Sequence, residues 1–380
     1  MAADPNKSGR KIPMKKLSIF ALIMAIYAGS AFAVGAGVGA RAVAMGGTGI
    51  AIANDVVSAA YFNPAALMYG PENVDIQLAG GGATQSIVNL AESISAGSDF
   101  IANNFDKTLS VNGSVAGGFG FSVKKVGISA IATGFGNFNK PANSLTFDML
   151  GNANVCVPLT LGSSFSTPGL PIASLAVGVN LKAIGIAQIK TNVVKSGVTG
   201  IGTMEQITGS GFGFDMGVLA KVTPLLSLGA VVRNLSASAN VTNKSTLLTV
   251  TAAGDVNPGT ETETKTTYTP APETGIGVGV VVPITGTLIA CDLENYSMPK
   301  NGDLNKSESF TDTHIGIEQG MLFNMVMLRF GYFTYSAFED SFYTWGIGFN
   351  AGPASLGVAS ANSVADSNNS VAMAQLGLAF

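Results

Sequence analysis

The sequence has few charged residues: they make up 11% of its 380 residues, against about 25% in ordinary soluble domains. It also has a single histidine, His314, and two cysteines, Cys156 and Cys291, which form no CxxC pair. So few imidazoles and thiols argue against a zinc site, and we expect no metal and no cofactor. The net charge of −3 gives no electrostatic reason for binding nucleic acid.

After residue 33 the sequence also lacks a strong run of about 18 apolar, uncharged residues, the length that suggests a transmembrane helix. The nearest run, residues 275–291, is interrupted by Pro283, Gly286 and two threonines. Yet 47% of the residues are apolar and 48 are glycine. Because only helices and closed barrels satisfy every backbone group in lipid, the sequence indicates either a soluble exported protein or a β-barrel.

The N-terminus has the form of an export signal. A positive stretch at residues 14–16 precedes an apolar stretch over residues 17–27 and an A-x-A cleavage motif at residues 31–33. We therefore predict that residues 1–33 are an N-terminal extension and signal peptide, cleaved after Ala33. An uncleaved membrane anchor is the alternative, which the short apolar stretch disfavours.

Several stretches alternate between bulky apolar residues and small or polar ones, which is the period of a β-strand. Over residues 343–349 the odd positions are Tyr, Trp, Ile and Phe, and the even positions are Thr and two Gly. Residues 175–182 alternate in the same way. One face that meets lipid and another that does not is typical of a membrane barrel. The sequence therefore predicts an all-β fold, a transmembrane antiparallel β-barrel over residues 73–380.

The spacing of these stretches predicts about fourteen strands, an even number as in bacterial single-chain barrels. Short turns alternate with long connections, as periplasmic turns alternate with extracellular loops. The short turns lie near residues 124–125, 222–224, 283–285, 320–323 and 352–353. The predicted long connections are residues 84–110, 139–154, 191–207, 239–272 and 297–310. The terminal Phe380 resembles the assembly signal of outer-membrane barrels.

Residues 34–72 precede the first strand, do not alternate, and carry a motif. They read GARA at residues 39–42, MGGTG at residues 45–49 and FNPAAL at residues 62–67. This run resembles the N-terminal signature of FadL-type outer-membrane transport proteins, and its GARA-x-x-MGG form is most similar to the PorV and conjugal-transfer TraF-like branch. The resemblance implies a fourteen-stranded barrel with an N-terminal hatch, or plug, inside the lumen over residues 34–72. The implied hatch residues are Arg41, Gly46, Gly47, Asp55, Asn63, Pro64 and Ala65.

The Asn63-Pro64 pair also has a physical interpretation of its own. Proline fixes its own φ and pushes the preceding residue out of the helical region. Asn63 is therefore expected to cap a turn or to bond the hatch to the wall; the alternative is that the pair only ends a helix. Because an unpaired charge is costly in a low-dielectric lumen, Arg41 and Asp55 are expected to pair with each other or with wall residues.

A set of polar residues falls on the inward faces of the last predicted strands. We predict that they form a structural ion-pair network across neighbouring strands. A serine–histidine hydrolase built on His314 is the alternative, but no nucleophile motif accompanies that histidine, so we do not expect an enzyme. The candidate lumen residues are Asp292, Glu294, His314, Glu318 and Arg329.

The first long connection has apolar residues at helical spacing. A helix over residues 85–106 would cover the mouth of the barrel and receive an apolar ligand, or it would only pack on the rim. The candidate capture residues are Ile87, Leu90, Ile94, Ile101 and Phe105.

Together these features predict an outer-membrane barrel of a diderm bacterium that lets small hydrophobic compounds, such as long-chain fatty acids, pass by gated passive diffusion. We expect an apolar, glycine-rich interior, because a water-filled pore favours a strongly charged lining. The expected partners are outer-membrane lipid and a small hydrophobic ligand. The alternative, implied by the PorV and TraF-like resemblance, is an interaction component of a secretion or conjugation machine, with a protein partner.

Overall fold

A computed structural model describes residues 37–83, 108–166, 173–251, 256–300, 303–365 and 370–380. The predicted signal peptide, the interpretation of it as an anchor, and the predicted helix over residues 85–106 all lie outside the described residues. Of the helices that the structure describes, none is long and apolar enough to cross a membrane.

The described residues form sixteen β-strands, and every pairing between them is antiparallel. Their bounds are β1 Val74–Ala83, β2 Leu109–Val123, β3 Val126–Lys140, β4 Phe147–Ser166, β5 Ser174–Ser196, β6 Thr199–Thr223, β7 Leu226–Arg233, β8 Ser238–Val250, β9 Val256–Tyr268, β10 Glu273–Val281, β11 Leu288–Lys300, β12 Asp303–Met321, β13 Val326–Tyr335, β14 Asp340–Ala351, β15 Ala354–Ser363 and β16 Ser370–Ala379.

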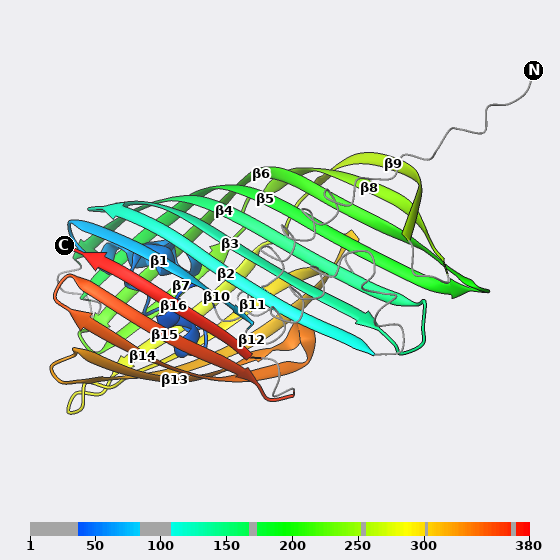
Figure 1. The fold of residues 1–380 in the computed structure, drawn as a ribbon. Coiled ribbons are helices and arrows are strands. Elements are labelled where there is room, and N and C mark those ends of the chain that lie inside the picture. Colours follow the sequence, from blue (N-terminus) through cyan, green and yellow to red (C-terminus); the bar gives the residue numbers. More distant parts are fainter. Residues whose placement is uncertain (1–36, 84–107, 167–172, 252–255, 301–302, 366–369) are drawn as a thin grey trace, which may run out of the picture.

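Fourteen of these strands, β1–β7 and β10–β16, close into a barrel, which confirms the predicted fold (Figure 1). The ring closes because β1 pairs with β16 and β5 pairs with β6. β6 changes partner along its length: residues 216–223 pair with β7, and residues 200–212 pair with β8. β8 and β9 therefore form a two-stranded crest that extends one side of the wall beyond the ring.

Four of the predicted long connections are wrong, because they consist largely of strand. Residues 139–154 hold the end of β3 and the start of β4. Residues 191–207 hold the end of β5 and the start of β6, joined at Gly197 with a φ of 64°. Residues 239–272 hold most of the crest, and residues 297–310 hold the ends of β11 and β12. These stretches lack the apolar alternation because they do not cross lipid; β9, for example, is exposed along most of its length.

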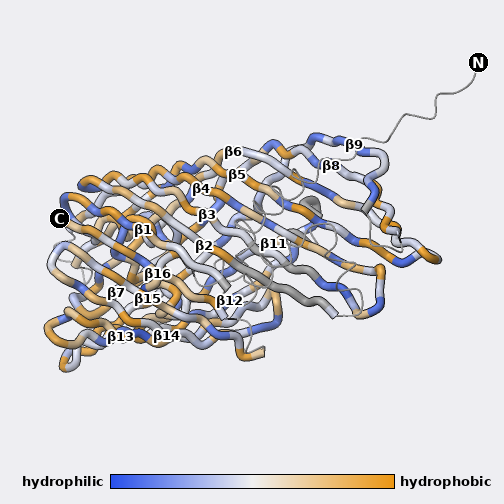
Figure 2. Tube along the Cα trace, in the orientation of Figure 1, coloured by the Kyte–Doolittle hydropathy of each residue, from blue (hydrophilic) through white to orange (hydrophobic). Residues whose placement is uncertain are grey.

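The outer face of the ring carries the bulky apolar residues that alternation predicts. Trp345 is 50% exposed and Phe330 is 60% exposed, although soluble proteins rarely expose large contiguous apolar patches. Figure 2 shows that the hydrophobic stretches gather toward the end of the barrel where the C-terminus lies, whereas β9 is more hydrophilic. This band is the surface that contacts membrane lipid.

The lumen at that end is filled by residues 37–70, here called the plug segment (Figure 1). It contains α3 (Ala40–Ala44), α4 (Val56–Phe62) and the 3-10 helix η1 (Pro64–Tyr69). α3 contacts β13–β16, α4 contacts β1–β4, and η1 contacts β4–β6. Most of its side chains are fully buried, and they join lumen-facing wall residues in one apolar core.

Candidate functional site

Asn63 links the plug segment to the wall in both of the ways that the sequence allowed. It is extended, with φ −156° and ψ 108°, and it separates α4 from η1. Its Oδ1 accepts from the Ala65 N–H at 3.1 Å, which caps η1. Its Nδ2 donates to Ile50 O at 2.9 Å and to Val218 O on β6 at 3.0 Å. The Asn63-Pro64 pair therefore does more than end a helix: it also caps the next helix and bonds the plug segment to the wall.

Glycines in the wall make room for this junction. A Cβ on Gly217 would collide with Asn63 Oδ1, and a Cβ on Gly178 would collide with the backbone of Pro64 and Ala65. The wall backbone can approach the plug segment this closely only because glycine has no side chain.

Arg41 pairs with the wall and not with Asp55. Its Nε and Nη2 donate to the two oxygens of Glu318 at 2.9 and 3.0 Å, and its Nη1 donates to Ile52 O at 2.8 Å. Arg329 Nε donates to the same Glu318 carboxylate at 2.6 Å. Asp55 instead caps α4 by accepting from the Ser58 N–H at 2.9 Å. One buried carboxylate thus holds two guanidinium groups, one from the plug segment and one from β13.

The Gly46-Gly47 pair is required by the backbone. Both residues have positive φ, 65° and 77°, a region that favours glycine. A Cβ on Gly46 would also lie 2.7 Å from the N atom of Tyr332 in the wall. Thr344 on β14 donates to Ala44 O at 3.0 Å and accepts from the Gly46 N–H at 3.1 Å. The MGG motif therefore fits a turn that is pressed against β12–β14.

Two other predicted lumen residues bind the same part of the plug segment. Asp292 Oδ2 on β11 accepts from the Gly49 and Ile50 N–H groups at 2.6 and 2.9 Å. His314 Nδ1 on β12 lies 2.8 Å from Gly46 O, and the histidine is 1% exposed. Asp292 and His314 face each other across the β11–β12 pair, but each bonds the plug segment and not the other.

The five predicted lumen residues therefore form separate groups and not one cross-strand network. Glu318 and Arg329 pair as expected, at directly opposed positions of β12 and β13. Asp292 and His314 anchor the plug segment, and Glu294 belongs to a third group around Arg233 on β7. The prediction of a cross-strand network did not include the plug segment, whose backbone supplies the hydrogen-bonding partners of Asp292 and His314.

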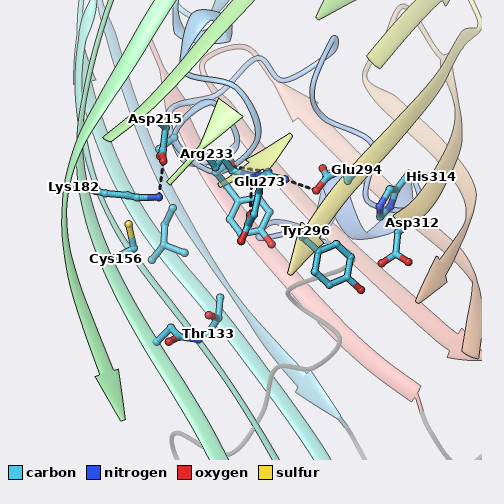
Figure 3. A pocket seen from close by; sticks show the side chains of 14 residues that line it. Thr133, Cys156, Lys182, Asp215, Arg233, Glu273, Glu294, Tyr296, Asp312 and His314 are labelled. Atoms are coloured by element: carbon cyan, nitrogen blue, oxygen red, sulfur yellow. Dashed lines mark hydrogen bonds and ion pairs between the residues drawn. The ribbon is translucent and has the colours of Figure 1, made fainter. Parts of the chain in front are cut away.

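Above the plug segment the lumen contains a cavity of about 190 Å³ that is partly open to solvent (Figure 3). Lys182 Nζ lies 2.6 Å from Asp215 Oδ1, and Arg233 pairs with Glu294 and, at 3.3 Å, with Glu273. The lining comprises Ala60, Tyr61, Ile131, Thr133, Asn154, Cys156, Lys182, Asp215, Arg233, Glu273, Glu294, Tyr296, Asp312 and His314.

This charged cavity contradicts the expectation of an apolar interior. Sequence reasoning missed Lys182, Asp215, Arg233 and Glu273. Their signal was present, because each falls on the inward face of an alternating strand, but a chain with so few charges overall gave no hint that they gather in one place.

Tyr61 joins the cavity to the plug segment. It belongs to α4, and its carbonyl oxygen accepts from Arg233 Nη1 at 3.3 Å. Burial raises the pKa of its phenol, so the hydroxyl stays neutral at physiological pH. The floor of the cavity is thus the plug segment itself, held by an arginine of the wall.

In the part of the chain that the structure describes, no three His, Cys, Asp or Glu residues gather in a way that could hold a metal ion. Cys156 on β4 and Cys291 on β11 are both free.

Fold and lumen together define an outer-membrane β-barrel with an N-terminal plug. No family model matches the sequence, and no curated protein matches it. Among solved structures, the chain is similar to the toluene transporter TbuX of Ralstonia pickettii, with a TM-score of 0.61 and 14% identity over 91% of this chain and 99% of that chain. It is similar to the toluene transporter TodX of P. putida, with a TM-score of 0.61 and 13% identity over 91% and 99% of the two chains.

A third similar structure is a FadL homologue of Pseudomonas aeruginosa, with a TM-score of 0.55 and 11% identity over 91% of this chain and 98% of that chain. The fold is therefore that of the FadL-type barrels, and the two toluene proteins named above are transporters and not enzymes. These similarities give no support to the expected closeness to the PorV and TraF-like branch.

Replacing Asn63 by alanine should loosen the plug segment. The change removes a helix cap and leaves the buried Ile50 O and the partly buried Val218 O without this donor, so we expect a loss of about 2–4 kcal/mol in unfolding free energy. Limited proteolysis of the folded barrel should then cut within residues 37–70. Asn257→Ala, on an exposed position of β9, is the matched control. In that variant residues 37–70 should resist the protease as well as they do in the unchanged protein.

Proposed function

We propose that this protein carries small hydrophobic compounds across the outer membrane by gated diffusion through the barrel. The observation that carries the proposal is the plug segment, which fills the lumen and contacts wall strands on all sides, with a ligand-sized cavity directly above it. The fold supports it, because similar solved structures include toluene transporters and a monoaromatic hydrocarbon channel.

In the proposed mechanism, a compound enters the cavity and passes when the plug segment shifts away from part of the wall. The polar contacts that must open include the Arg41–Glu318 pair, the Asp292 bonds to Gly49 and Ile50, and the Asn63 bond to Val218. Elsewhere the plug segment packs closely against wall glycines. The concentration gradient of the compound drives the passage.

Uptake by whole cells tests this proposal. Lipopolysaccharide slows the passage of hydrophobic compounds, so cells expressing the barrel should accumulate radiolabelled toluene several-fold faster than cells with an empty vector. Dodecanoate, measured in parallel, tests whether fatty acids are also accepted. Equal toluene rates with and without the barrel, at equal amounts of folded protein, would contradict the proposal.

The alternative role in a secretion or conjugation machine stays a prediction from the sequence resemblance. Gentle extraction of the tagged barrel and mass spectrometry of what remains bound distinguishes the two roles. A protein partner recovered in stoichiometric amounts, together with unchanged toluene uptake on deletion, would favour the machine.

A further inference from the structure

The lumenal cavity has an excess of negative charge. Among the described residues that line it, four are carboxylates, Asp215, Glu273, Glu294 and Asp312, and two are cations, Lys182 and Arg233. A lining of this composition attracts a cationic group and repels an anionic one, and the low-dielectric surroundings strengthen both effects.

Both cations are already committed to protein partners. Lys182 Nζ lies 2.6 Å from Asp215 and donates to Asn234 Oδ1 at 2.8 Å. Arg233 lies between Glu273 and Glu294 and also donates to Tyr61 O at 3.3 Å. A ligand carboxylate would therefore have to displace one of these protein carboxylates before it met a positive charge.

Asp312, in contrast, forms no ion pair with a cation among the described residues. It is 1% exposed, and its Oδ1 accepts from the Ser336 N–H at 2.8 Å. The Tyr296 hydroxyl lies next to it and hydrogen-bonds the Asp312 side chain, so this carboxylate has neutral donors but no cation to balance its charge. A buried carboxylate without a neighbouring cation is unfavourable, so a ligand that placed a protonated amine there would gain binding energy.

The opposite side of the cavity suits an apolar group. Figure 3 shows Thr133 and Cys156 across the cavity from Asp312. Together with Ile131 and Asn154 they form an uncharged wall on β3 and β4. The cavity thus has an uncharged side and a negatively charged side, with a carboxylate oxygen as the acceptor.

From this arrangement we infer that the cavity selects small apolar compounds that carry a protonated amine, bound by Asp312, and discriminates against carboxylates. The inference rests on the proposed uptake function and specifies its substrate class. It also disfavours long-chain fatty acid anions as the principal substrates.

Three compounds that share one aromatic ring test the inference: benzylamine, toluene and benzoate. Equilibrium binding to the purified, detergent-solubilised barrel should be at least tenfold tighter for benzylamine than for benzoate at neutral pH. Asp312→Asn should weaken benzylamine binding by about tenfold, since a hydrogen bond to a charged group is lost, and should weaken toluene binding much less than this. Asn keeps an oxygen that can accept from Ser336, and Glu261→Gln on the exposed face of β9 is the control for loss of a carboxylate.

Each other outcome has a defined meaning. Benzoate binding as tightly as benzylamine overturns the inference without any variant, and so does an Asp312→Asn protein that keeps the full preference for the amine. If toluene uptake by cells also fails, the proposed function fails with it. Toluene uptake that persists while the amine preference is absent refutes the substrate class alone.

Discussion

Replacing Glu318 by alanine is expected to release the plug segment and make the barrel leak ions. The change leaves Arg41 and Arg329 together in a buried site with no carboxylate between them, and both donate to Glu318 in the unchanged protein. Removing one partner of a buried ion pair costs about 3–5 kcal/mol, and here two cations lose the same partner. Because Arg41 belongs to α3, the substitution weakens the contact between the plug segment and the wall.

Single-channel recording in planar bilayers measures this effect. The unchanged barrel should show little conductance, because the plug segment fills the lumen, whereas Glu318→Ala should show frequent large openings. Glu261→Ala is the matched control: it removes a carboxylate that pairs with Lys244 at 2.8 Å but is half exposed on the crest, and exposed pairs contribute little. A Glu318→Ala barrel as tight and as heat-stable as the unchanged protein would show that this ion pair does not hold the plug.

The second large effect is expected from a disulfide between the plug segment and the wall. A Cβ on Gly357 of β15 would lie 3.2 Å from the Cβ of Ala40 in α3, slightly closer than the roughly 3.5–4.5 Å typical of a disulfide. In a background with Cys156→Ser and Cys291→Ser, the pair Ala40→Cys and Gly357→Cys should therefore form a disulfide with small adjustment. If passage requires the plug segment to move away from β15, oxidation should slow toluene uptake at least tenfold.

Reduction supplies the internal control for this variant. Dithiothreitol should restore uptake in the same cells, and each single cysteine variant should be insensitive to oxidant. Uptake that continues unchanged in protein shown by mass spectrometry to be fully oxidised would exclude a mechanism in which α3 leaves the wall. Passage would then have to depend on movement elsewhere, for example of α4 or η1.

The barrel could be predicted from the sequence because lipid imposes a pattern on it. Positions such as Trp345 and Phe349 face outward and remain about half exposed, so the alternation of bulky and small residues records the membrane directly. The crest escaped prediction because β9 is polar and exposed along most of its length, so it shows no alternation of bulky apolar residues. Alternation therefore located the segments that cross the membrane but not the full length of the strands.

The site was predictable only where local chemistry decided the outcome. Pro64 restricts the backbone of Asn63, so few roles were possible for this asparagine. Both expected roles, the cap of a turn and the bond to the wall, are present. The partner of Arg41 was not predictable, because Glu318 lies 277 positions away in the sequence and meets it only when the barrel closes. The charged cavity was missed because its members come from six different strands, β5, β6, β7, β10, β11 and β12, each of which contributes one or two charges.

The partner change of β6 separates the wall into a closed ring and an appendage. Arg233, the last residue of β7, directly opposes Glu273, the first residue of β10. A short turn could therefore join these two residues and omit the crest without breaking the ring. Within the crest, β8 packs against residues of β5 and β6, whereas β9 pairs only with β8 among the strands that the structure describes. The outer strand β9 is thus the part that can change in length or sequence independently of the barrel, and it is the natural position at which to insert a foreign peptide.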